Sequence, residues 1–145
     1  MLKKIYNPIS SEYLDFKKYC KSEQITWNWS ERHCEMGEYN PPDWDENCFN
    51  FGFYGHVFLL PPNERFLYSV PISEKTMEAH DVVRGILEFN KIKVDRIYRI
   101  AVNISMPIDG KGHSLPHTDH PFDHKNLIVY LTNPEGGSTV CEGEE

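Results

Sequence analysis

Apolar residues recur at helical spacing in two stretches of the chain. Two serines precede the segment EYLDFKKYCK, whose apolar residues share one helical face. This pattern predicts a short amphipathic helix over about 11–22 with a serine N-cap. Residues 73–91 carry a stronger helical pattern, with Ser73 in the capping position and an apolar stripe made of Ala79, Val82, Val83, Ile86 and Leu87.

Between these two predicted helices, apolar and polar residues alternate as in β-strands, and an irregular stretch interrupts this alternation. The segment ITWNW at 25–29 predicts a strand, and FNFGFYGHVFLLPP at 49–62 predicts a strand or a hairpin that stops at its two prolines. Residues 31–50 are irregular, and the stretch 37–47 is rich in acids and aromatic residues. We expect this stretch to be a loop, either a lid over a substrate or a surface loop packed over Trp44.

The second half of the chain is strongly β-prone. The segment RIYRIAVNISMP at 96–107 alternates between an apolar face that includes Ile100 and Val102 and a polar face that includes Asn103. A glycine turn, IDGKGH, and a short extended stretch, SLPHTDHP, lead to KNLIVYLTNPEGG at 125–137, and STVCEGEE begins a further strand. Helices followed by closely spaced strands predict an α+β fold, mainly β, with an antiparallel sheet or sandwich.

Length and composition narrow the class of protein. The chain has 145 residues, of which 39% are hydrophobic and 13% aromatic, so we expect a single domain over 1–145 with a compact core. A formal net charge of −7 without a Lys/Arg-rich run argues against nucleic-acid binding. No stretch approaches the roughly 20 apolar residues of a membrane helix, and no apolar run follows the N-terminal lysines. We therefore expect neither a membrane span nor a signal peptide, and a cytoplasmic location.

Four of the seven histidines lie within residues 113–124, and the sharpest part of this cluster is His117–Thr118–Asp119. In a strand, side chains two positions apart point to the same face, so this imidazole and this carboxylate can hold one metal ion from one side. One nitrogen and one oxygen ligand suit a divalent first-row metal, above all Fe(II) when a second histidine completes a facial triad. His117 and Asp119 are therefore the candidate metal ligands.

The remaining histidines and the cysteines have more ordinary interpretations. We expect His113, His120 and His124 to be solvated surface residues, with the alternative that the last two form a zinc ligand pair. The other histidines have no evident partner and are expected to be structural or exposed: His33, His56 and His80. The cysteines form no CxxC pair and are expected to be reduced apolar side chains: Cys20, Cys34, Cys48 and Cys141.

From about Arg96 to Glu142 the chain resembles the Fe(II)/2-oxoglutarate-dependent dioxygenases, in particular the prolyl-4-hydroxylase-like branch found also in phage genomes. The resemblance rests on the order of its parts: the strand RIYRIAVNIS, a glycine-containing turn, HTD, a strand with the Tyr-Leu of IVYLTN, and the Gly-Gly of GGSTV. It implies a double-stranded β-helix, or jelly roll, braced by the two N-terminal helices.

The resemblance also implies roles for individual residues. It makes His117 and Asp119 the first two iron ligands, and it makes Tyr130 a residue that binds 2-oxoglutarate through its hydroxyl. The alternative for Tyr130 is a core aromatic residue of a strand. Asn103 and Arg99 lie on the polar face of their strand, where they could line the cosubstrate pocket or face solvent.

The chain also departs from the family pattern. The family carries a second histidine on a later strand, followed by a basic residue, usually arginine, that clamps the far carboxylate of 2-oxoglutarate. After Asp119 the sequence has no arginine. The basic or imidazole side chains in that part of the sequence are His120, His124 and Lys125. We therefore expect a jelly roll that is incomplete at its C-terminus and inactive alone, either a piece of a longer oxygenase or a short inactive relative. His124 could stand in as the third ligand if its loop folds back.

Two further classes of protein remain open. One is a non-catalytic jelly-roll module that binds metal or acts as an interaction domain, and the other is a cupin-like enzyme, which needs ligands that we do not locate. For the oxygenase, the expected cofactors are Fe(II) and 2-oxoglutarate, and the expected partner is a peptide or small-molecule substrate. Its expected location is the cytoplasm, of the host if the chain is phage-encoded.

Overall fold

The computed structural model describes residues 3–31, 52–106, 120 and 122–133, and the backbone of 48–49 and 113–114. Its elements in chain order are α1 (Ser11–Cys20), β1 (Asn28–Ser30), β2 (Cys48–Phe49), β3 (Phe53–Leu60), β4 (Val70–Pro71), α2 (Thr76–Phe89), β5 (Ile100–Ser105) and β6 (His113–Ser114). The predicted loop at 37–47 and the predicted strand at 138–145 lie outside the described residues.

Helix α1 lies where the sequence predicts it. Ser10 is its N-cap, and the Ser10 Oγ accepts a hydrogen bond from the backbone N–H of Tyr13 at 3.2 Å. Tyr13 and Cys20 are buried, and Phe16 packs against the same core, so the predicted apolar face is confirmed.

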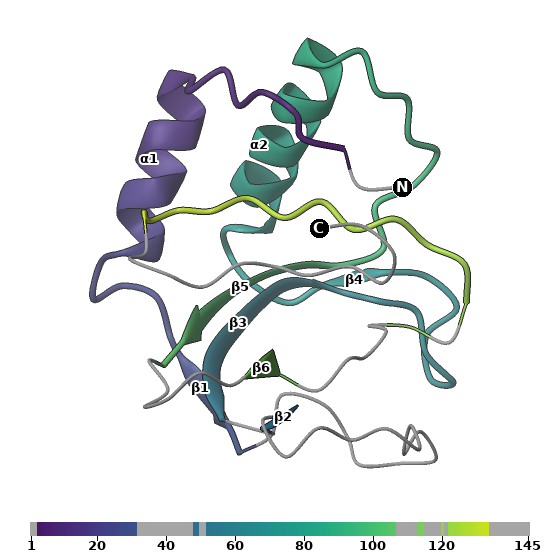
Figure 1. Cartoon of the computed structure of the whole chain (residues 1–145). Coiled ribbons are helices and arrows are strands. Elements are labelled where there is room, and N and C mark those ends of the chain that lie inside the picture. The colour runs from purple at the N-terminus through teal and green to yellow at the C-terminus, as the bar shows by residue number, and fades with distance from the viewer. Residues whose placement is uncertain are drawn as a thin grey trace.

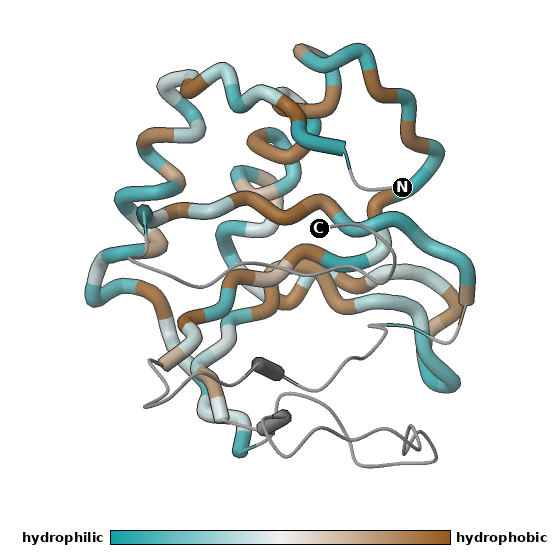
Figure 2. The backbone as a smooth tube through the Cα atoms, viewed as in Figure 1, coloured by the Kyte–Doolittle hydropathy of each residue, from teal (hydrophilic) through white to brown (hydrophobic). Residues whose placement is uncertain are grey.

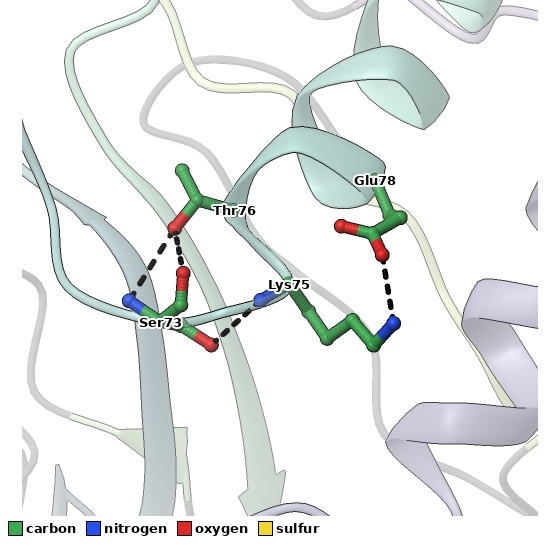
Figure 3. A network of polar contacts seen from close by, with 4 residues as sticks. All are labelled: Ser73, Lys75, Thr76 and Glu78. Carbon is green, nitrogen blue, oxygen red and sulfur yellow. Dashed lines mark hydrogen bonds and ion pairs between the residues drawn. The ribbon is translucent and has the colours of Figure 1, made fainter.

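Helix α2 begins later than predicted. The prediction that Ser73 caps the helix is wrong, because Ser73 lies in a turn before the first helical residue, Thr76. The carbonyl of Ser73 accepts a hydrogen bond from the N–H of Thr76 at 3.2 Å. It also accepts one from the Thr76 hydroxyl at 2.6 Å (Figure 3). The predicted apolar stripe is confirmed, since its buried residues are Ala79, Val82, Ile86 and Leu87.

Strand β3 is the centre of a four-stranded antiparallel sheet. Gly55 of β3 pairs with Asn28 of β1 on one side and with Asn103 of β5 on the other. Leu59 likewise lies between Pro71 of β4 and Ile100 of β5. β1 and β4 therefore share one edge of β3, and β5 occupies the other edge. The predicted segment 49–62 thus contains one long strand rather than a hairpin.

Both helices cover one face of this sheet (Figure 1). Phe58 of β3 is fully buried and packs with Cys20, Ile25 and Ala79, while Ile100 and Val102 of β5 lie against the same cluster. A second cluster joins the two helices through Tyr13, Val82 and Ile86. The apolar face predicted for the segment 96–107 is therefore confirmed for Ile100 and Val102, whereas its other members are exposed: Tyr98, Ile104 and Met106.

The segment 122–133 is extended but is not a strand, so the strand predicted over 125–137 is wrong for its described part. Its alternation is nevertheless real, because Leu127, Val129 and Leu131 pack against the helix clusters. Figure 2 shows this hydrophobic stretch crossing the helix pair. The alternating apolar residues of this segment are partly buried against the helices. No described strand pairs with the segment.

The architecture is mixed, with helices on one side of an antiparallel sheet, as the predicted α+β class requires. The short parallel pair of β2 and β6 lies on the side of the sheet away from the helices (Figure 1). In the part of the chain that the structure describes, neither helix is long and apolar enough to cross a membrane.

Candidate functional site

The sheet face away from the helices carries the first of the predicted site residues, Asn103. Its neighbour Val102 packs into the helix-covered core, so alternation along β5 turns Asn103 to the opposite face. Asn103 lies beside Gly55, where a Cβ atom would approach the Asn103 Oδ1 to 3.2 Å. The glycine therefore leaves room for an exposed amide on this face. Arg99 precedes the strand and is half-buried.

The two predicted metal ligands, His117 and Asp119, lie outside the described residues. The described chain on either side of them is β6, at His113–Ser114, and His120. The backbone of His113 pairs with Cys48 in the small parallel ladder on the side away from the helices.

His120 and His124 are half-buried and lie in an aromatic cluster at the surface, in which Phe122 is exposed. The His120 ring stacks on Phe122 with centroids 5.0 Å apart, and the His124 ring meets His120 edge-on at the same distance. The Tyr98 ring meets the Phe122 ring edge-on, with centroids 5.6 Å apart. The Nδ1 of His124 donates to the carbonyl of Phe122 at 2.7 Å, because a carbonyl can only accept. In a neutral His124 the Nε2 therefore keeps its lone pair.

Tyr130 lies on the extended segment between Val129 and Leu131, both of which pack against the helix clusters. Its side chain is 56% exposed, so it is not the core aromatic residue that we considered as the alternative. The hydroxyl-bearing ring is therefore accessible from outside the helix core.

A polar notch at the sheet edge was not indicated by the sequence. It lies along the shared edge of β3 between the start of β1 and the end of β4, and it is lined by side chains that include Tyr19, Gln24, His56 and Ser73. His56, expected to have no particular partner, is hydrogen-bonded through both ring nitrogens, to the Thr26 carbonyl at 2.8 Å and to the Ser73 Oγ at 3.0 Å. Burial, followed by the charge of Glu74, raises the pKa of the Tyr19 hydroxyl above its ordinary value, so Tyr19 is a neutral donor at physiological pH.

Among the described residues, no group of three or more histidine, cysteine or acidic side chains is arranged to hold a metal ion. A zinc site built from His120 and His124 would thus need ligands from elsewhere. Comparison of the chain with family models, curated proteins and solved structures found no match.

Proposed function

We propose that the chain is the metal-binding part of an oxygenase that uses Fe(II) and 2-oxoglutarate to hydroxylate a C–H bond of a peptide or small molecule, on a jelly-roll fold. The observation that carries this proposal is the order of motifs along the sequence. Along the chain, a glycine turn comes first and HTD follows it. An alternating run that contains Tyr-Leu comes next, and Gly-Gly comes last. A three-residue match to HxD alone is common by chance, whereas this order of motifs is much more specific for the dioxygenase family.

The donor chemistry suits ferrous iron. His117 supplies an imidazole nitrogen and Asp119 a carboxylate oxygen, which also neutralises part of the charge of the ion. The third ligand of a facial triad would be a histidine from elsewhere, and within this sequence His124 is the candidate because its Nε2 carries the free lone pair.

The proposal assigns the binding of 2-oxoglutarate to two described residues, Asn103 and Tyr130. Asn103 offers an exposed amide on the sheet face away from the helices, the side on which β6 also lies. Tyr130 offers an exposed side chain on a segment whose alternate residues, Leu127, Val129 and Leu131, pack against the helices. In this proposal both side chains bind and orient 2-oxoglutarate by hydrogen bonds.

When bound, iron and 2-oxoglutarate supply the oxidative chemistry, in which decarboxylation to succinate is coupled to hydroxylation of the substrate. The protein supplies ligands, orientation and a site that excludes water. For these 145 residues alone we expect little or no succinate, because the sequence after Asp119 contains no arginine to clamp the far carboxylate.

The test is therefore metal binding rather than turnover. We expect anaerobic equilibrium dialysis to show Fe(II) bound by the full chain, with affinity reduced at least about tenfold in H117A and in D119A, since each loses a direct ligand. H113A is the matched control, because it removes a histidine from the same stretch of sequence, and it should bind like the wild type. Unchanged affinity in D119A would overturn the ligand assignment. Weak Fe(II) binding that H113A reduces as much as H117A does would favour a non-catalytic module.

A further inference from the structure

The notch between β1 and β4 joins three segments through one imidazole. His56 comes from β3, the Thr26 carbonyl precedes β1, and Ser73 lies in the turn before α2. These residues surround a cavity of about 480 Å³, which Tyr19 also lines from α1. The three segments are far apart in the sequence, so the fold itself assembles this arrangement.

The hydrogen bonds define where the protons are. The Thr26 carbonyl can only accept, so the Nδ1 of His56 carries a hydrogen and donates it over 2.8 Å. In the neutral ring the Nε2 is then an acceptor, and the Ser73 hydroxyl, 3.0 Å away, donates to it. A hydroxyl is thus bonded to an imidazole base whose tautomer is set by a third group, which is the arrangement that activates serine nucleophiles.

The backbone N–H groups of the two residues after Ser73 adjoin this hydroxyl. The backbone N–H of Glu74, the residue after Ser73, makes no hydrogen bond to the described part of the chain. The N–H of Lys75 points to the Ser73 Oγ at 3.4 Å (Figure 3). Both groups come just before α2, whose N-terminal end favours negative charge.

We propose that Ser73 is an activated nucleophile and that the notch is an acyl-transfer site for small carboxylic esters, made of other residues than those proposed to bind iron. As the Ser73 Oγ bonds to the acyl carbon, its proton passes to the Nε2 of His56. The ester C–O bond then breaks, the departing alcohol takes that proton, and the acyl group remains on Ser73. Water then hydrolyses the acyl group: it gives a proton to the Nε2 of His56, and its oxygen bonds to the acyl carbon. The bond from the acyl carbon to the Ser73 Oγ breaks, Ser73 takes the proton back from Nε2, and the carboxylic acid leaves.

The charges around the notch restrict the substrate. Glu74 lines the cavity and is exposed, and the other side chains of the lining are neutral polar or apolar groups, apart from the titratable His56 and Tyr19. An anionic ester would be repelled by this carboxylate. The site therefore suits a neutral or cationic ester with hydrogen-bonding groups for Gln24 and Asn28.

The test is covalent labelling of the full chain with a neutral alkyl fluorophosphonate, which bonds to activated serine oxygens. Intact mass followed by peptide mapping should find one adduct, on Ser73. We expect the rate to fall at least about a hundredfold in H56N, because the base is lost while the asparagine amide can still donate to Thr26. S73A should show no adduct.

Ser69 is the internal control, because its hydroxyl donates to the Tyr98 carbonyl at 2.9 Å and not to an imidazole. In the wild-type chain Ser73 should label at least about a hundredfold faster than Ser69, a comparison that needs no variant to fold. Equal labelling of the two serines, no adduct on Ser73, or an undiminished rate in a folded H56N would overturn the proposal. His56 would then be a purely structural link between sheet and helix. No metal is added in this experiment, so its result does not depend on the proposed oxygenase function.

Discussion

At the scale of single residues, the hydroxyl of Thr76 joins the start of α2 to the sheet. It lies 2.7 Å from the Phe58 carbonyl and 2.6 Å from the Ser73 carbonyl, and Thr76 is only 6% exposed. T76V keeps the shape and removes the hydroxyl, so we expect a loss of about 1–3 kcal/mol in the free energy of unfolding. Urea denaturation measures this loss, and T76S is the control that should retain most of the stability. A T76V variant as stable as the wild type would contradict this role.

Cys20 gives a second prediction at this scale, because burial raises the pKa of its thiol from 9.0 to about 11. In the folded protein the thiol stays protonated, so we expect iodoacetamide at pH 8 to modify Cys20 only after unfolding, as peptide mapping would detect. Because the folded state holds this proton more tightly than the unfolded state, the thiol contributes to the free energy of unfolding. This contribution is fully present below pH 9 and is lost as the pH rises toward 11. C20A should lack this part of the alkaline loss of stability. Rapid modification of Cys20 in the native chain would contradict the assignment.

At the scale of elements, Asn90 fastens the N-terminal segment to the end of α2. Its Oδ1 accepts from the Tyr6 N–H at 3.0 Å, and its Nδ2 donates to the Tyr6 carbonyl at 2.6 Å. We expect N90A to speed hydrogen exchange of the Tyr6 amide about tenfold or more, because both bonds are lost. N63A removes a turn asparagine that bonds the N–H of Arg65 and should leave Tyr6 unchanged. Equal protection of Tyr6 in N90A and the wild type would show that the segment is held otherwise.

Comparison of the individual elements shows which of them the sequence predicts well. The helices α1 and α2 depend on local spacing and capping, so their apolar faces follow directly from the residues. The start of α2 differs from the prediction, because the first helical residue, Thr76, bonds to Phe58, a residue distant in the sequence. The segment 122–133 alternates like a strand, but its apolar side chains are buried against helices instead of in a paired sheet. Alternation reports burial of one face, and pairing depends on a neighbour that the sequence does not indicate.

At the scale of the whole molecule, the two candidate sites differ in how they could be found. His117 and Asp119 are two positions apart, so a local motif suffices to propose them. His56 bonds partners 30 and 17 positions away, and no spacing along the chain indicates that contact. The sequence therefore predicts the α+β class and a metal-ligand pair, whereas the polar notch depends on how β1, β3 and α2 come together.

The position of Fe(II) in a crystal of the full chain tests the central claim most directly. Anomalous scattering at the iron edge, from crystals grown without oxygen, locates the ion independently of any assumption about its ligands. We expect one peak within bonding distance of both a ring nitrogen of His117 and a carboxylate oxygen of Asp119. An ion held by other residues, such as His120 and His124, or a structure in which the two side chains point to opposite sides of their segment, would contradict the oxygenase proposal.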